Sequence, residues 1–199
     1  LNNRFSELAM KPEATFVAAG SFYGELVKEK DAFTAVYLTK QGQETQAYAD
    51  LLLQLEGMRR YGFTNAELDR VKKDWLSAYE EAYNERNTVR NITYAQEYIR
   101  HYLDKAPIPG IAWEYQMVQQ VLPILTVDML NQIAQTLVTD NNLIISFQAP
   151  VEAVLPTEAE AVELLAAVKN EEIEAPVEEA IRENLVEVAP KAGKIKKTK

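Results

Sequence analysis

The sequence predicts an α+β domain in which several helices are layered on a small mixed or antiparallel sheet of three strands. Two runs near the start of the chain are rich in β-branched and aromatic residues and flank a short polar insert. A series of amphipathic helical patterns follows, and one more apolar run comes after them. Hydrophobic residues make up 47% of the 199 residues, which is enough to fill a core.

The first elements are the end of a helix and a hairpin. Residues 1–10 place apolar side chains on one helical face, and Pro12 ends that helix. The runs at 15–27 and 32–40 enclose the polar insert 28–31 and predict a β-hairpin. Gly20 and Gly24 lie inside the first run, so we expect a bend or bulge there.

The middle of the chain predicts about five helices. The first covers 44–61 and ends at Gly62, a residue suited to a helix C-terminus. Thr64 and Glu67 form a capping box that starts the second, and the helical pattern then runs to Lys105.

The long helical pattern has a break near 87–91, and the loop 106–110 ends it, because two prolines flank one residue there. Helices at 111–122 and from Thr126 onward follow. The residues expected to face the core are Tyr48, Leu51, Leu52, Leu55, Met58, Leu68, Val71, Trp75, Ala78, Tyr79, Ala82, Ile92, Ala95, Ile99, Tyr102, Leu103, Val127, Leu130, Ile133, Ala134 and Leu137.

The predicted domain ends with a third strand. Residues 139–142 predict a turn, and the apolar run at 143–150 then predicts a strand in the interior of the sheet.

The character of the chain changes after Pro150, and we place a domain boundary there. Residues 151–199 hold 11 Glu but no aromatic residue, and Thr157 with Glu160 caps a short helix through Lys169. We therefore expect a truncated domain at 1–150 and a helix-containing acidic linker at 151–199. The basic end of this linker consists of Lys191, Lys194, Lys196, Lys197 and Lys199.

Composition excludes several classes of function. The formal charge of −9 argues against binding to nucleic-acid phosphates or to anionic lipid. The absence of cysteine excludes a thiol nucleophile, a disulfide framework and a thiolate metal site. No apolar run approaches the roughly 20 residues that span a bilayer.

The one histidine, His101, is the first candidate for chemistry. Glu97 and Asp104 lie one helical turn from it, and together they would supply part of a metal site. A histidine-based zinc site takes two or three histidines, so a helix-surface residue is the favoured interpretation. We expect no catalytic, cofactor-binding or metal-ligating residue in the chain.

Three other groups have both a functional and a structural interpretation. The acidic cluster Glu80, Glu81 and Glu85 could bind a cation, but a solvated helix face is favoured because calcium sites usually need a loop. Residues 140–142 resemble part of a calcium loop and are interpreted as a turn. The ten tyrosines, with Trp75 and Trp113, could form a sugar or peptide platform, but we expect them to be core.

Six stretches, taken in order, resemble one family. They are LNNRFSELA, YGFTNAELDRVKKDWLSAYEEAYNER, YAQEYIRHYLD, PIPGIAWEYQ, LPILTVDMLNQIAQ and PTEAEAVELLAAVKNEEIEAPVEE. Together they resemble the second domain, and the following inter-half linker, of large bacterial zinc metallopeptidases of the pitrilysin/insulinase family.

The resemblance implies a two-half protein that closes around a peptide. The first domain of such proteins carries the inverted motif H-x-x-E-H, which holds zinc and supplies the general base. That motif is absent here, so zinc is expected in a catalytic domain outside these residues. The implied fold is the LuxS/metallohydrolase-like α+β domain.

The resemblance also gives a residue-level expectation about substrate. Domains of this family that hold substrate carry an Arg after the first helix and a Tyr seven residues later. Ala9 and Phe16 stand at these positions here, so the chain is expected to contact a peptide substrate only indirectly.

The implied partners are the catalytic domain and the C-terminal half of the same polypeptide, with no nucleic acid and no membrane. The chain begins without an initiator Met, and the resemblance implies about 80 earlier residues that complete the sheet. Without them we expect a shortened sheet, or a dimer through an exposed sheet edge.

The sequence leaves three functions open. The first is a non-catalytic structural domain of a zinc metalloendopeptidase, the second a free-standing interaction module, and the third a scaffold from a catalytically inactive relative. The resemblance suggests periplasmic or secreted relatives, while the chain itself does not give the compartment.

Overall fold

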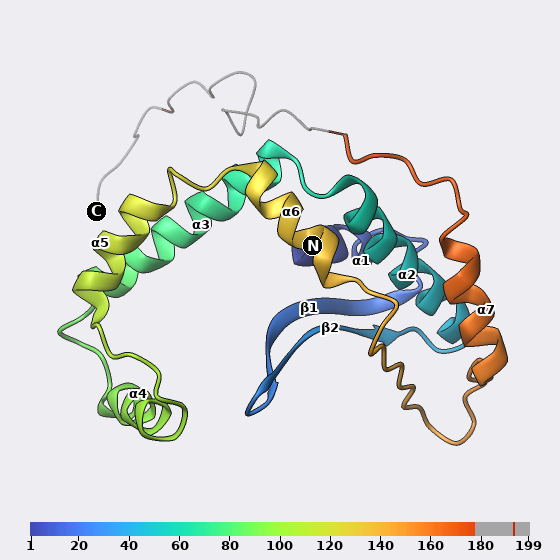
Figure 1. Cartoon of the computed structure of the whole chain (residues 1–199), viewed down its shortest axis with the longest axis horizontal. Helices are drawn as coiled ribbons and strands as arrows, with labels where there is room; N and C mark the ends of the chain where they lie inside the picture. Colours follow the sequence, from blue (N-terminus) through green and yellow to red (C-terminus); the bar gives the residue numbers. More distant parts are fainter. Residues whose placement is uncertain (178–192, 194–199) are drawn as a thin grey trace.

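The computed structural model describes residues 1–177 and residue 193, and within them it has the expected α+β architecture. One antiparallel sheet of two strands is accompanied by seven helices (Figure 1). The elements, in order, are α1 (Asn2–Ala9), β1 (Phe16–Val27), β2 (Lys30–Thr39), α2 (Glu44–Tyr61), α3 (Asn65–Asn84), α4 (Asn91–Asp104), α5 (Ile111–Val121), α6 (Val127–Leu137) and α7 (Glu158–Val168).

These elements form a body and an arm. The hairpin, α1, α2, α6 and α7 make the body, while α3 and α5 lie side by side and lead away from it (Figure 1). Helix α4 lies at the far end of that arm.

The predicted hairpin is confirmed, with a tighter turn than expected. Only residues 28 and 29 connect the strands, because Lys30 and Asp31 join β2. The bulge that was one of the two expectations at Gly20 and Gly24 is absent, although the hairpin does bend along its length (Figure 1). Both glycines pair in regular register, and the irregularities lie near the two ends of the ladder, where the strands leave their regular pairing.

The third strand predicted at 143–150 is also wrong for this structure. Ile144 is 84% exposed, and residues 143–149 make no hydrogen bond to any other described residue. A strand must pair its N–H and C=O groups with a neighbouring strand, and this segment makes no such pairing with β1 or β2. Only Phe147 is anchored, with its ring edge-on to Tyr48 at a centroid distance of 5.2 Å.

The helix boundaries follow the capping residues that the sequence shows. Helix α2 ends at Gly62, which has a φ of 65° and whose N–H donates to the Met58 carbonyl at 2.8 Å. The capping boxes at Thr64 and at Thr157 are both present, and Thr126 caps α6. The predicted break in the long helical pattern covers residues 85–90.

The core is smaller than the sequence predicts. Of the residues expected inside, Tyr48, Leu51, Leu52, Met58, Leu68 and Ala134 are buried, but Val71, Trp75, Ile92, Ile99, Tyr102, Leu103 and Ile133 are exposed. Tyr48 is the one buried tyrosine of ten. The expectation that the aromatic residues form core is therefore wrong. Too few other helices and strands pack on the arm to bury its aromatic side chains.

Helix α7 is held to α2 by Arg60, which belongs to an ion cluster around the buried Glu56. The Glu56 side chain lies inside, 6% exposed, and accepts hydrogen bonds from Arg59 and Arg60 at 2.5–2.7 Å. The hydrogen bond from Arg59, together with that from Arg60, lowers the pKa of Glu56. Arg60 also reaches across to donate to the carbonyls of Val168, Lys169 and Glu171 at 2.8–3.2 Å. Arg60 thus ties the last turn of α7 to the body.

No helix within the described residues is long and apolar enough to cross a lipid bilayer.

We predict that Arg60→Met loosens α7 and that Arg59→Met does not. Arg60 alone bridges Glu56 to the α7 carbonyls, and the loss of such charge-assisted bonds costs on the order of 1–2 kcal/mol. Hydrogen exchange of residues 158–168 should therefore speed up about tenfold in the first variant. If both variants lose protection equally, charge pairing with Glu56 holds α7, and the hydrogen bonds from Arg60 to the carbonyls do not.

Candidate interaction surfaces

His101 lies exposed on α4 and is not part of a metal site in the described residues. Its Nδ1–H donates to the Ala106 carbonyl at 2.7 Å, which fastens the C-terminal end of α4. No hydrogen bond joins it to Glu97 or Asp104 there. Across residues 1–177 no three Asp, Glu or His side chains come together as a metal would require. The described residues therefore do not fit a zinc ion. The expectation that the whole chain holds no metal-ligating residue stays a prediction.

The two acidic groups considered as cation sites do not form such sites in the described residues. Glu80, Glu81 and Glu85 lie at the end of α3 and form no metal-binding group there. Residues 140–142 form a bend in which Asp140 pairs with Lys169 at 2.6 Å. The terminal lysines from Lys191 onward lie outside the described residues.

Ala9 and Phe16 stand where substrate-holding domains of the family carry Arg and Tyr, and both have structural roles here. Ala9 is the last residue of α1, and Phe16 begins β1 with 4% of its surface exposed. The Phe16 ring is therefore part of the core.

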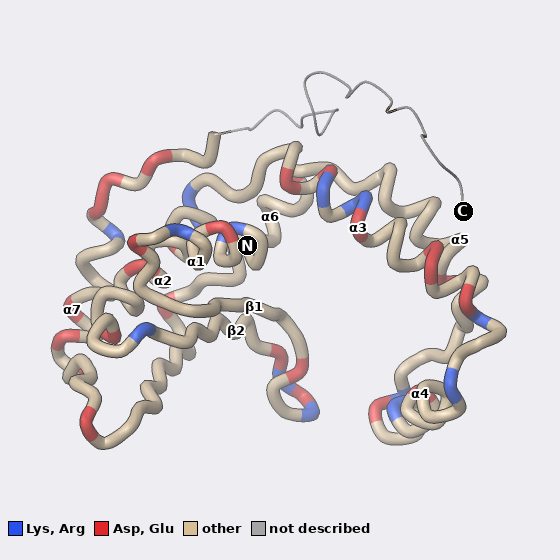
Figure 2. Tube along the Cα trace, turned by 180° about the vertical axis from the view of Figure 1, so that it is seen from behind, with Lys and Arg blue, Asp and Glu red and all other residues tan. Residues whose placement is uncertain are grey.

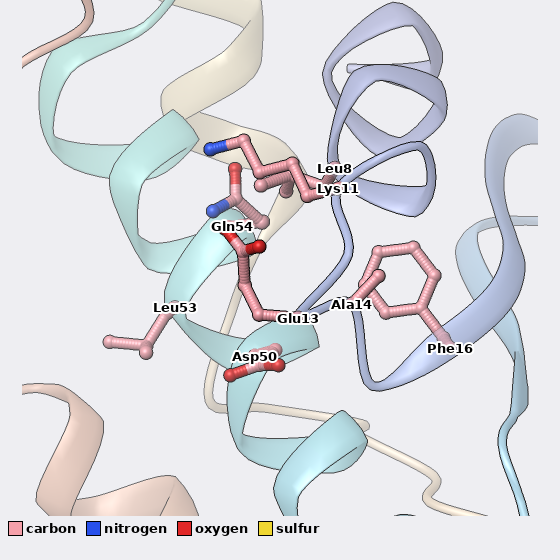
Figure 3. Close-up of a pocket in the computed structure, with 8 residues that line it drawn as sticks. All are labelled: Leu8, Lys11, Glu13, Ala14, Phe16, Asp50, Leu53 and Gln54. Atoms are coloured by element: carbon pink, nitrogen blue, oxygen red, sulfur yellow. The ribbon is translucent and has the colours of Figure 1, made fainter.

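One pocket, of about 190 Å³, lies between α1, the start of β1 and α2. Figure 3 shows its lining, which is Leu8, Lys11, Glu13, Ala14, Phe16, Asp50, Leu53 and Gln54. Asp50 is already used, because it accepts from the Thr15 hydroxyl at 2.6 Å and from Gln46 at 3.0 Å. The pocket has no histidine or serine that could act as a nucleophile or base.

A polar junction joins four helices, α1, α2, α3 and α6. Arg4 of α1 donates to both Glu67 carboxylate oxygens at 2.5 and 2.7 Å and to the Gly62 carbonyl at 2.8 Å. Its guanidinium lies 5.0 Å from the centre of the Phe63 ring. The same Glu67 carboxylate accepts from the Thr64 N–H at 2.8 Å, which completes the capping box of α3.

Helix α6 joins this junction through Asn131. Its side-chain amide accepts from the Phe63 N–H at 2.7 Å and donates to the Phe63 carbonyl at 3.1 Å. A Cβ at Gly62 would overlap this amide, and the positive φ of Gly62 also disfavours a side chain. The close approach of α6 to the α2–α3 turn therefore depends on this glycine.

The junction shifts the ionisation of Glu67. Burial raises its pKa, but the hydrogen bonds from Arg4 and Thr64 and the Arg4 charge outweigh that effect, so the pKa lies below its usual 4.5. A lowered folded-state pKa adds stability that is complete above the unfolded value and is lost as pH falls through the folded value.

Part of the surface of the arm is apolar and exposed. No residue of α4 is buried, although Ile92, Tyr98, Ile99, Tyr102 and Leu103 share one helical face. Tyr102 is 75% exposed. On α3 and α5, Trp75 and Trp113 are each about half exposed. Large apolar side chains gathered and exposed on one helical face, as on α4, make that face a candidate interaction surface.

Sequence reasoning missed Arg4, Asn131 and Glu56, which carry the junction and the α7 contact. The one sequence signal for Glu56 is that it is a charged residue within the apolar helical pattern of 44–61. Arg4 and Asn131 have no local signal, because their partners are 58–68 residues away.

We predict that Arg4→Met destabilises the chain by about 2 kcal/mol at pH 7, since it removes charge-assisted bonds to a mostly buried carboxylate. The loss should shrink as the pH falls through the lowered pKa of Glu67, because the wild type then loses the carboxylate charge that Arg4 binds. Urea unfolding at pH 7 and pH 3 measures both values.

Arg70→Met is the matched control. Its partner Glu7 lies 3.1 Å away with both side chains largely exposed, so its loss should cost less than about 1 kcal/mol. A pH-independent loss for Arg4→Met would contradict the role assigned to Glu67.

Comparison with known proteins gives related sequences and structures, although no family model matches the chain. The chain is 30% identical over 140 residues to a protein described as "Zinc protease PQQL-like" from Arabidopsis thaliana. This match covers 69% of the chain and 15% of the plant protein.

Two crystal structures share the fold. For the first half of the periplasmic protease PqqL from Escherichia coli, the TM-score is 0.71 at 18% identity, covering 88% of this chain and 38% of that one. For the longer PqqL structure, the TM-score is 0.73 at 17% identity, covering 96% and 21%. The chain is therefore related to the PqqL-like zinc proteases of the pitrilysin family, as its sequence predicted, and its match covers a portion of those larger proteins.

Proposed function

We propose that this chain is a non-catalytic structural domain of a zinc metalloendopeptidase, forming part of the wall that encloses the peptide and packing on the catalytic domain. Its partners are the catalytic domain and the C-terminal half of the same polypeptide. It touches a peptide substrate only indirectly, and zinc is held outside it. Residues 1–150 form the domain and residues 151–199 lead toward the other half.

The uncovered face of α4 is the observation that carries this proposal. Five large apolar side chains lie on a helix that has no buried residue, so nothing in the described chain uses that face. Covering it would contribute about 25 cal/mol per Å² of apolar surface removed from water. The relatives are several times longer than this chain and have the polypeptide that such a cover needs.

The chemistry present in the chain is consistent with a supporting role. The described residues have one exposed histidine, whose Nδ1 is occupied, and no cluster of metal-binding side chains. The buried charge of Glu56 and the partly buried Arg4–Glu67 pair are each matched by an opposite charge that holds helices together.

We predict that the isolated chain retains no stoichiometric zinc after dialysis and cleaves no peptide, whereas the longer polypeptide does both. His101→Ala should leave the activity of the longer polypeptide unchanged. Metal analysis and a peptide-cleavage assay, with and without a chelator, measure this. One zinc held per isolated chain would contradict the proposal. A longer polypeptide that is zinc-free and inactive would favour the scaffold function.

The α4 face provides the second arm of this test. Tyr98→Ser combined with Tyr102→Ser should lower the stability of the longer polypeptide by about 2–4 kcal/mol, because both rings would be covered there. The isolated chain should change little, since both rings are already exposed. Arg100→Gln, an exposed residue on the polar side of α4, is the matched control. An equal effect in both proteins would contradict the packing.

A further inference from the structure

We propose that the C-terminal turn of α2 is a docking site for the segment that follows α7, residues 169–173. Helix α7 and this docked segment then move with the domain as one body when the halves of the longer polypeptide open and close. The inference rests on the proposed function, in which residues 151–199 lead toward the other half. It deepens that function by placing no hinge between the halves in the chain up to Ile173.

Two neighbouring side chains of α2 bind the backbone of the docked segment. Beyond its bond to the end of α7, Arg60 donates to the carbonyls of Lys169 and Glu171 at 2.9 and 2.8 Å. The Tyr61 hydroxyl donates to the Ile173 carbonyl at 2.9 Å. Backbone carbonyls that have left a helix need new partners, and α2 supplies them along the whole segment.

The Arg60 guanidinium is fixed from the side of α2. Its Nε donates to the buried Glu56 carboxylate at 2.6 Å. Since Nε and both terminal nitrogens have partners, the guanidinium is held in one orientation, with its outer N–H groups directed at the docked segment. Arginine suits this site because its planar fork donates in several directions at once.

The charges of the two surfaces are complementary. Figure 2 shows acidic residues along α7 and along the segment that follows it. Residues 158–174 contain six Glu and one Lys, and the last turn of α7 has no basic residue. A cation beside the last turn of a helix is favourable, because it faces the negative end of the helix dipole. Arg60 supplies this cation from α2.

Gly57 provides the apolar part of the docking site. It is the one glycine of α2 and is buried, and a Cβ built on it would lie 3.5 Å from Cγ2 of Ile173. Glycine weakens the interior of a helix, so its presence there calls for a local reason. The close approach of Ile173 to the backbone of α2 supplies one.

Helix α7 itself shares the core of the domain. Ala161 and Val168 are buried in one cluster with Tyr48 and Leu52 of α2, and Figure 1 shows the two helices side by side. The Tyr48 hydroxyl also donates to the Ala161 carbonyl at 3.3 Å. Lifting α7 away would expose this apolar surface and would strip Arg60 of its carbonyl partners, and both changes are unfavourable.

The docking limits where the halves can pivot. A hinge forms where a segment makes few contacts, whereas the docked segment is bound at its carbonyls and by the pair of Lys169 with Asp140 at 2.6 Å. The tether between the halves is therefore shorter by α7 and the docked segment. A shorter tether raises the effective concentration at which the halves meet.

Cleavage by a glutamate-specific protease measures the docking in the isolated chain. Glu171 and Glu172 lie in the docked segment, so cleavage after them requires the segment to lift from α2. Tyr61→Phe removes the bond to the Ile173 carbonyl and should speed this cleavage about fivefold. Tyr98→Phe is the matched control, because that exposed hydroxyl makes no hydrogen bond within residues 1–177. Equal cleavage rates in the two variants would overturn the inference.

Substitutions at Gly57 give a second readout of the same cleavage. Gly57→Ala should leave the rate close to that of the wild type, because its Cβ would lie at an ordinary contact distance from Ile173. Gly57→Leu places further atoms against Ile173 and should raise the rate by about tenfold. A leucine variant cleaved as slowly as the alanine variant would count against the contact.

A disulfide tests the one-body movement in the longer polypeptide. Gly57→Cys combined with Ile173→Cys would lock the docked segment onto α2, and the close approach of the two residues suits a disulfide. Small-angle scattering with and without added peptide measures opening and closing, and the oxidised form should move as the reduced form does. Movement that is lost on oxidation and restored on reduction would overturn the inference, as would a cysteine pair that does not cross-link.

The outcomes separate this inference from the proposed function. If oxidation abolishes the movement while the α4 tyrosine variants destabilise the longer polypeptide, the domain packs as proposed but α7 has to lift, and the inference alone fails. If neither form of the cysteine variant moves and the α4 variants have no effect, the proposed function fails and the inference fails with it.

Discussion

The Arg4–Glu67 ion pair is the contact on which the arrangement of this chain depends. It joins the first helix to the start of α3, and its atoms also bind the Gly62 carbonyl and the capping box of Thr64. Asn131 brings α6 to the same turn. Because few large side chains are buried in the described residues, directional polar bonds and not apolar bulk set the angles between these helices. A core this small tolerates the loss of such a contact poorly.

The junction has a second consequence, because it is where the arm leaves the body. The chain turns at Gly62, and α3 starts at once with a completed capping box, so the direction of α3 is fixed within a few residues. Helix α5 follows α3 through the stacked rings of Tyr83 and Tyr115, 5.3 Å apart. The place of α4 at the end of the arm is thereby set by polar contacts at the other end (Figure 1).

Local chemistry explains which parts of this fold were predictable. Gly62, Thr64, Thr126 and Thr157 act on their own helices within four residues, and each boundary was predicted from them. The strand expected at 143–150 and the buried positions expected for Trp75 and Tyr102 depend on what lies beside them, which sequence periodicity does not report. The same limit hid the junction, whose partners are distant in sequence. A pattern of apolar residues shows which face will be covered, and not by which part of the polypeptide.

These discrepancies have a common physical cause. The apolar run at 143–149, the α4 face and the β2 edge each have the composition of interior structure. Within the described residues, however, the run pairs with no strand, the α4 face is exposed and the outer edge of β2 is unpaired. A self-sufficient domain would instead carry polar residues or edge protection at such places. Because the unmet surfaces include both backbone groups and side chains, a complementary cover must supply a strand as well as apolar packing. The packing proposed above, on the rest of a longer polypeptide, would supply both.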